Sequence, residues 1–195
     1  MGYTLIDKDT VTSSTANVDY TIDGTYDEIF FTVTGFKSTV DSRNLGFQFI
    51  TASEGGYDLP IQSAAWKQHA YAHGSSTGIA YESAWDSDIS DKDDTATQFA
   101  RMCQGGDTSE SHSAASGELT LYRPQDTTHY KFYLSVAHSH DAASTAAQEL
   151  AQLFRTAGYV KDTDAIIGIR FVSCDYSGDQ DGNINYGEFA MYGLS

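Results

Sequence analysis

Alternating apolar and polar positions recur along the chain and predict β-strands. Residues 16–22 place Ala, Val, Tyr and Ile at every second position, which is typical of a strand with one buried face. Residues 28–36 form a β-branched and aromatic run, which predicts a strand buried on both faces near the middle of a sheet. A strand predicted over residues 45–51 follows closely and ends before Gly55 and Gly56, so we expect the two strands to pair as a meander.

Strand candidates continue to the end of the chain. They are residues 64–72, 78–85, 99–103, 117–122, 128–138, 165–172 and 184–192. Residues 64–72 and 78–85 are the weaker candidates. Residues 99–103 are predicted to be a short strand inside a polar, turn-rich loop over residues 86–116. Residues 117–122 and 128–138 are predicted to form a hairpin across Pro124, and residues 165–172 and 184–192 to form another.

One segment departs from this pattern and predicts a short helix. Thr145–Gln148 has the form of a capping box, and apolar residues follow it at helical spacing, namely Leu150, Leu153, Phe154 and Ala157, before Gly158. Many short strand candidates with at most one short helix favour an all-β fold. We predict an antiparallel β-sandwich, jelly-roll-like, that occupies residues 1–195 as a single domain.

The charge balance excludes several classes of partner. The chain has 195 residues with 27 acidic and 11 basic side chains, a formal net charge of −16. Binding to nucleic acid or to anionic lipid needs clustered Lys and Arg, so we expect neither partner. No apolar run is long enough to cross a membrane, and the first residues lack the basic start and apolar core of a signal peptide.

The sequence offers no recognisable catalytic motif, and we expect a protein that is not an enzyme. There is no GxSxG or SxxK, and Ser, His and Asp are too abundant for an imagined triad to carry weight. The two cysteines, Cys103 and Cys174, are 71 residues apart and form no CxxC. A single disulfide stays open, although two buried free thiols are favoured.

The strongest match to a known binding motif is an acidic segment near the C-terminus. Residues 177–189 fit most of an EF-hand calcium loop, with Gly182 at the sharp turn and Glu188 at the bidentate position. Ser177 stands where the motif has an aspartate, and a strand-like stretch precedes it where the motif has a helix. We therefore favour a hairpin turn over residues 175–183. A weak Ca²⁺ site without an EF-hand fold stays open, with Asp175, Asp179 and Asp181 as ligands.

The histidines and tryptophans are weaker candidates for binding. His138 and His140 would share one face of a strand, and His69 lies four residues before His73, but neither pair has a third metal ligand at a known spacing. We expect surface or core roles for them. Aromatic rings stack on the apolar faces of sugars, so exposed tryptophans are candidates for glycan binding, although a core or interface role is the alternative. The candidates are Trp66 and Trp85.

The order of these segments resembles structural and fibre-tip proteins of tailed bacteriophages, notably those of marine bacteria. The segments that carry the resemblance span nearly the whole chain. They are Thr12–Ala16, Thr25–Phe31, Phe47–Phe49, Glu54–Tyr57, Gly117–Pro124, Ala165–Phe171 and Gly182–Leu194. In similar sequences the last turn is shorter, so residues 179–181 resemble an insertion. The resemblance also implies a strand near residues 154–159, where the periodicity predicts a helix.

The resemblance implies a virion surface protein of jelly-roll type with no catalytic residues to carry over. We expect no cofactor apart from the open Ca²⁺ site. A fibre tip needs a stalk and an N-terminal anchor to the tail, whereas strand-like sequence here begins within a few residues of Met1. We therefore expect an exposed decoration or knob protein on the head or tail, bound to capsid or tail proteins. A homo-oligomer is expected, and a trimer would suit an icosahedral lattice. The alternative is a carbohydrate-binding module that recognises the host, such as a tail-fibre tip.

Overall fold

The computed structural model describes residues 2–24, 26–53, 55–57, 59–71, 77–81, 99–105, 113–141 and 150–195. Every regular element in these ranges is a β-strand. The strands are β1 (Thr4–Val11), β2 (Asn17–Thr21), β3 (Glu28–Ser38), β4 (Asn44–Thr51), β5 (Ile61–Tyr71), β6 (Thr77–Tyr81), β7 (Ala100–Gln104), β8 (Ala114–Tyr122), β9 (Lys131–Asp141), β10 (Leu150–Val160), β11 (Ile166–Cys174) and β12 (Ile184–Leu194).

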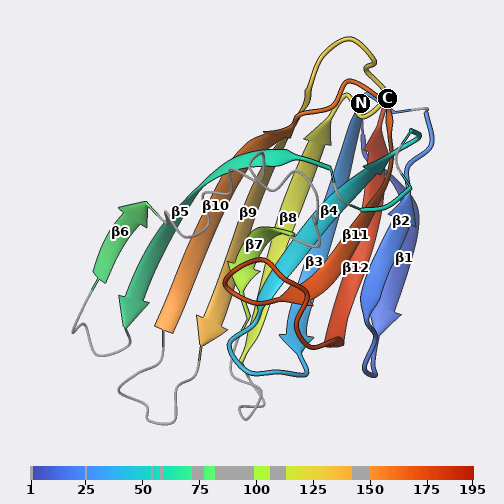
Figure 1. Ribbon diagram of the computed structural model, residues 1–195. Coiled ribbons are helices and arrows are strands. Elements are labelled where there is room, and N and C mark those ends of the chain that lie inside the picture. The colour runs from blue at the N-terminus through green and yellow to red at the C-terminus, as the bar shows by residue number, and fades with distance from the viewer. Residues whose placement is uncertain are drawn as a thin grey trace.

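The strands form two antiparallel sheets that pack face to face (Figure 1). The large sheet has the order β1-β12-β3-β8-β9-β10-β5-β6, and the small sheet has the order β2-β11-β4-β7. The predicted antiparallel β-sandwich is therefore confirmed.

Eight of the strands form a jelly roll, because the first half of the chain pairs with the second half as one long ribbon. The pairs are β1 with β12, β2 with β11, β3 with β8, and β4 with β7. Rolling such a ribbon puts β1-β12-β3-β8 in one sheet and β2-β11-β4-β7 in the other, which is the observed order.

The other four strands are two insertions that widen the large sheet. The β5–β6 hairpin follows β4, and the β9–β10 pair follows β8. The insertions meet along the full length of β10 and β5, from Leu150 opposite Tyr71 to Val160 opposite Ile61. Figure 1 shows β5 and β6 at the end of the large sheet, beyond the strands of the small sheet.

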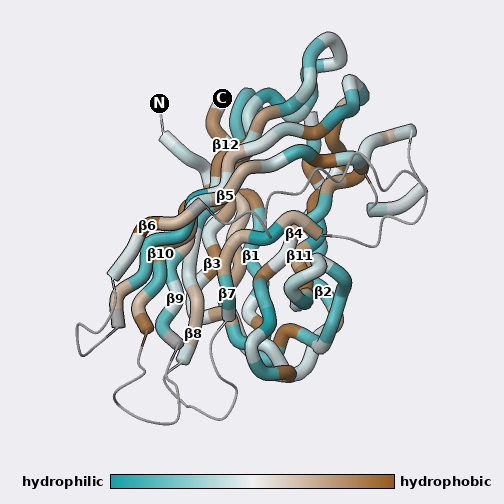
Figure 2. The backbone as a smooth tube through the Cα atoms, turned by 60° about the vertical axis from the view of Figure 1, so that its left-hand side comes forward, coloured by the Kyte–Doolittle hydropathy of each residue, from teal (hydrophilic) through white to brown (hydrophobic). Residues whose placement is uncertain are grey.

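The core lies between the two sheets and is built from alternating residues. In β3 the side chains of Ile29, Phe31 and Val33 are buried, and the residues between them are less so. Phe171 of β11 packs between Phe31 and Phe189, with both ring centroids 5.7 Å away. Figure 2 shows the resulting alternation of hydrophobic and hydrophilic positions along the strands.

Three sequence-based predictions about the strands are wrong. Strand β3 is central in its sheet, but its burial alternates, whereas β4 and β7 are buried on both faces. The expected β3–β4 meander does not form, because β4 pairs with β11 and β7 in the other sheet. The expected β11–β12 hairpin does not form either, because β11 pairs with β2 while β12 pairs with β1. In a rolled ribbon, strands that follow each other often change sheet.

The predicted helix is also wrong over its described part. Residues 150–160 form strand β10, which pairs with β5 on one side and β9 on the other. The capping box at Thr145–Gln148 lies outside the described residues. The β8–β9 hairpin, in contrast, is confirmed. The described residues include no helix long and apolar enough to cross a membrane.

Candidate functional site, an outer groove on the inserted strands

The outer face of the large sheet, which points away from the small sheet, carries a row of side chains from the inserted strands. Because side chains alternate between the faces of a strand, one set of alternate residues points outward. The register aligns Leu134, Ala157 and Ala64 in one row, and Val136, Arg155 and Trp66 in the next. Residues on neighbouring rows are therefore close enough to form one surface.

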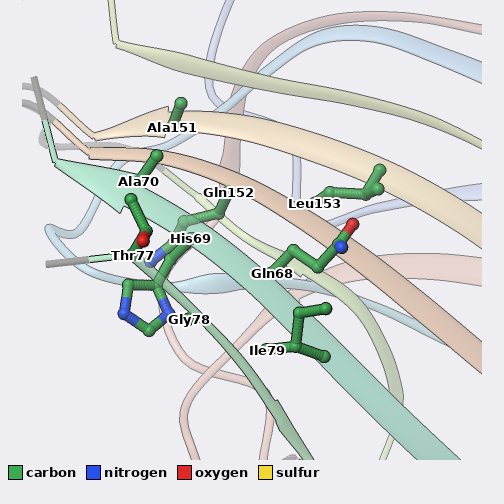
Figure 3. Close-up of a pocket in the computed structure, with 9 residues that line it drawn as sticks. All are labelled: Gln68, His69, Ala70, Thr77, Gly78, Ile79, Ala151, Gln152 and Leu153. Atoms are coloured by element: carbon green, nitrogen blue, oxygen red, sulfur yellow. The ribbon is translucent and has the colours of Figure 1, made fainter. Parts of the chain in front are cut away.

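This surface is hollowed into a groove of two adjoining parts, which we call the outer groove. The first part has a volume of about 400 Å³ and is lined by Trp66, Gln68, Ile79, Leu134, Leu153, Arg155 and Ala157. The second has a volume of about 440 Å³, and its lining is drawn in Figure 3. It combines outward-facing residues with three that alternate to the inner face. The outward-facing ones are Gln68, Ala70, Thr77, Ile79, Ala151 and Leu153, and the other three are His69, Gly78 and Gln152. The two parts share Gln68, Ile79 and Leu153 in their linings. Volumes of this size are typical of small-molecule sites.

Trp66 is the one predicted glycan-binding residue that the structure places in this groove. Its side chain is 45% exposed on β5, and Arg155 of β10 lies directly opposite it in the register. Directly opposed residues have Cβ atoms about 5 Å apart, so the indole and the guanidinium border the same space. The second candidate, Trp85, lies outside the described residues.

Arg155 differs from the other arginines of the chain. Arg43 and Arg170 form ion pairs with Asp181 and Asp19, Arg123 lies 3.8 Å from Asp126, and Arg101 donates a hydrogen bond to the Tyr176 carbonyl. Within the described residues, Arg155 forms no ion pair and no hydrogen bond. Its exposed guanidinium therefore borders the groove with no side-chain partner among the residues that the structure describes.

The histidine candidates are spread over the same sheet. His138 and His140 share the outer face of β9, as predicted, and lie opposite Leu153 and Ala151 of β10. His69 lies on β5 against Gly78 of β6, where a Cβ added to the glycine would lie 3.0 Å from the imidazole Cε1. His73 is outside the described residues. Across the described ranges, no group of three or more His, Cys, Asp or Glu side chains is arranged to hold a metal ion.

The acidic loop over residues 175–183 connects the two sheets, and protein groups already engage two of its carboxylates. Asp175 Oδ1 accepts hydrogen bonds from the backbone N–H groups of Ser177, at 2.7 Å, and Asp179, at 3.0 Å. Asp181 Oδ2 lies 2.6 Å from Arg43 Nη2 and 2.7 Å from Arg43 Nε. Asp179 is exposed. A Ca²⁺ ion bound by these three residues would have to compete with Arg43 for Asp181.

The rest of this loop is held by hydrogen bonds to the small sheet. Asn44 Nδ2 donates to the Asp175 carbonyl at 2.9 Å, and the Phe99 N–H donates to the Gly178 carbonyl at 2.8 Å. Strand β11 precedes the loop where an EF-hand has a helix, so the segment is not an EF-hand. The loop is therefore held against the small sheet, and the side chains of Asp175 and Asp181 have protein partners.

The two cysteines are buried, and both are free thiols. Burial raises the pKa of the Cys103 thiol to about 12 and raises that of Cys174 as well. Neither thiol is therefore a thiolate near neutral pH, so neither is available as a nucleophile. This agrees with the two buried thiols that the sequence favours.

Two exposed aromatic clusters lie on the outer face at separate places. One joins Tyr130, Phe132 and Tyr159 near the groove, with Tyr130 and Tyr159 stacked at 5.7 Å. The other, which we call the terminal cluster, joins Tyr3, Phe30 and Tyr192 near the two chain ends, which lie side by side in Figure 1. Aromatic residues are enriched in protein interfaces, so both clusters are candidate contact surfaces.

Sequence reasoning missed most of the groove because it assigned β10 to a helix. Arg155, Leu153 and Ala157 line one face only if residues 150–160 are a strand. The available signal was the resemblance described above, which implies a strand near residues 154–159. No family model matches the chain, and no protein of curated function and no solved structure matches it either.

Proposed function

We propose that the chain is a non-enzymatic structural protein of a tailed-bacteriophage virion, an exposed decoration or knob protein on the head or tail. It would be present as a homo-oligomer, bound to capsid or tail proteins. The observation that carries this proposal is the resemblance of seven ordered segments to phage structural and fibre-tip proteins. Several of those segments coincide with strands of the jelly roll, for example Gly117–Pro124 with β8 and Gly182–Leu194 with β12.

The terminal cluster supports docking through one edge of the large sheet. Tyr3, just before the edge strand β1, and Leu5 of that strand are exposed, Leu5 to 53%, and Leu5 lies opposite Tyr192 of β12. An exposed apolar group on an edge strand favours association with another protein surface. The same edge would therefore contact the particle or a neighbouring copy.

The net charge of −16 is consistent with a crowded outer shell. Like charges on many identical copies repel each other, which keeps such copies soluble and limits unwanted contacts. Tight docking would then depend on a local apolar surface such as the terminal cluster.

The proposal is tested by labelling purified particles of the virus that encodes the chain with an antibody against the recombinant protein. We expect many labelled copies on the head or the tail, in an ordered arrangement visible by electron cryomicroscopy. A protein that is abundant in the infected cell but absent from purified particles would refute a virion role.

The docking edge is tested separately with a pair of matched variants. Leu5→Asp places a charge beside the terminal cluster, whereas Ile167→Asp places one at a 38% exposed position on the other sheet. We expect only Leu5→Asp to reduce the oligomer mass in sedimentation or the occupancy of particles. Equal behaviour of the two variants would argue against docking through this edge.

A second candidate function is recognition of a host glycan, and the outer groove favours it. Trp66 offers an exposed ring for stacking, and Gln68 and Arg155 offer hydrogen-bond donors beside it. The groove lies on β5, β6, β9 and β10, away from the terminal cluster. A virion protein could therefore dock through one region and hold a sugar at the other. Screening the wild-type protein on a glycan array, with and without calcium, tests this function directly.

A further inference from the structure

We propose that the outer groove binds a carboxylated sugar, with the Trp66 indole against the sugar ring and the Arg155 guanidinium against the carboxylate. This inference rests on the glycan-recognition candidate and not on the virion role. It names the ligand class and the two residues that would select it.

Charge is the first argument for an acidic ligand. The chain has 11 basic side chains against 27 acidic ones, and the other four arginines bind protein oxygens. Arg155 has no ion pair or hydrogen bond in the described part of the chain, although the chain is rich in carboxylates. On its own row the exposed Glu118 of β8 lies two strands away, which is about 10 Å between backbones. The position therefore leaves a planar cation available to a carboxylate from outside, which it can bind with two parallel hydrogen bonds.

The lining of the groove is the second argument, because it suits a sugar better than a fully polar anion. Leu134, Leu153 and Ile79 provide apolar walls, and Ile79 is 74% exposed. A sugar ring presents C–H groups to such walls and to the Trp66 ring, while its hydroxyl groups can bond the Gln68 amide. A bare phosphate or sulfate ion would leave this apolar surface uncovered.

The location of the groove is the third argument. Its lining comes from β5, β6, β9 and β10, which are the four strands that a jelly roll does not need. Long paired strands hold side chains more rigidly than loops do, and Arg155 is flanked by hydrogen-bonded strands on both sides. The insertions therefore build a preorganised surface onto an existing fold.

The experiment uses the full chain and a panel of oligosaccharides of uronic and sialic acids, each beside its neutral methyl ester. We expect at least one acidic member to bind, and its ester to bind at least tenfold more weakly in isothermal titration. Arg155→Gln should weaken the acidic member about tenfold to a hundredfold and leave the ester unchanged, because it removes a charge-assisted pair. Trp66→Ala should weaken both forms, because it removes the stacking surface.

Two control variants test whether a loss of binding is specific to residues of the groove. Lys8→Gln removes a cation that is paired with Glu188 at the far end of the sheet, and Phe132→Ala removes an exposed ring outside the groove. Neither should change binding. Equal binding of acid and ester, or binding unaffected by Arg155→Gln, would overturn the acidic specificity while leaving glycan recognition intact. Failure of the panel and of the glycan array together would overturn both, without bearing on the virion role.

Discussion

Removal of the Phe171 ring tests the assignment of the core most directly. Phe171 is fully buried between the sheets, and its ring contacts Phe31 and Phe189. A buried aromatic side chain removes roughly 150–250 Å² from water, which at about 25 cal/mol per Å² corresponds to roughly 4–6 kcal/mol. Alanine keeps the Cβ, and the surroundings relax in part, so we expect Phe171→Ala to lower the free energy of unfolding by about 3–5 kcal/mol.

The assay is urea unfolding followed by fluorescence, together with thermal unfolding. At this chain length the expected loss corresponds to a fall in Tm of roughly 6–20 °C. If Phe171→Ala does not fold, Phe171→Leu provides a milder test with an expected loss of roughly 1–2 kcal/mol.

The matched control is Phe132→Ala, the same substitution at a 57% exposed position on the outer face of the large sheet. We expect its cost to stay within about 0.5–1 kcal/mol, because little buried surface is lost. A loss below about 1.5 kcal/mol for Phe171→Ala, or similar losses for both variants, would refute the reasoning.

Three further changes probe other parts of the fold. Because Arg43 binds Asp181, we expect no calcium heat in wild-type titrations, and a heat that Asp181→Ala abolishes would instead establish the calcium site. Gly158→Ala should cost about 1–3 kcal/mol in urea unfolding, since its Cβ would clash with the Gln62 carbonyl oxygen, whereas Gly55→Ala, with open space around it, should be neutral. The Thr128 and His129 contacts lower the pKa of Asp126 to about 2 from an ordinary 3.8. Its stabilising effect is therefore present above pH 4, and the difference in urea midpoint from Asp126→Ala should vanish as the pH falls towards 2.

The fold class could be predicted from the sequence, but the pairing of the strands could not. Alternation in segments such as residues 16–22 depends only on which face of a strand is buried, so it survives in any sandwich. Pairing depends on how the ribbon rolls. Sequence adjacency correctly identified the β8–β9 hairpin and failed for β11 and β12, which follow each other but belong to different sheets.

The helix at residues 150–157 was predicted because polar residues face the interior of β10. Gln152 accepts a hydrogen bond from Ser139, and the Thr156 hydroxyl donates one to the Arg101 carbonyl, so both side chains are satisfied while buried. The outward face carries Leu153 and Ala157 in turn. Both faces of β10 mix polar and apolar residues, since Phe154 is buried and Arg155 is exposed, so no period of two is visible and a helical period fits by chance.

Because residues 150–157 were predicted as a helix, the groove could not be predicted from the sequence. Nothing in the sequence placed Arg155 beside Trp66, which lies 89 residues earlier in the chain. Only the β10–β5 register makes the two neighbours. Residue type alone makes Trp66 a candidate for glycan binding, whereas identifying Arg155 as its charged neighbour required the structure.

The pairing of β1 with β12 has a consequence for how the chain folds during synthesis. Thr4 lies opposite Gly193, so the first strand of the large sheet cannot be paired until the last strand has left the ribosome. Until then β1 has no partner, and β3 has its neighbour β8 but lacks β12. Contacts so distant in sequence slow folding, because a large loop must close before they can form. We therefore expect slow folding that completes only after β12 has been synthesised, with unpaired strands exposed to aggregation during translation.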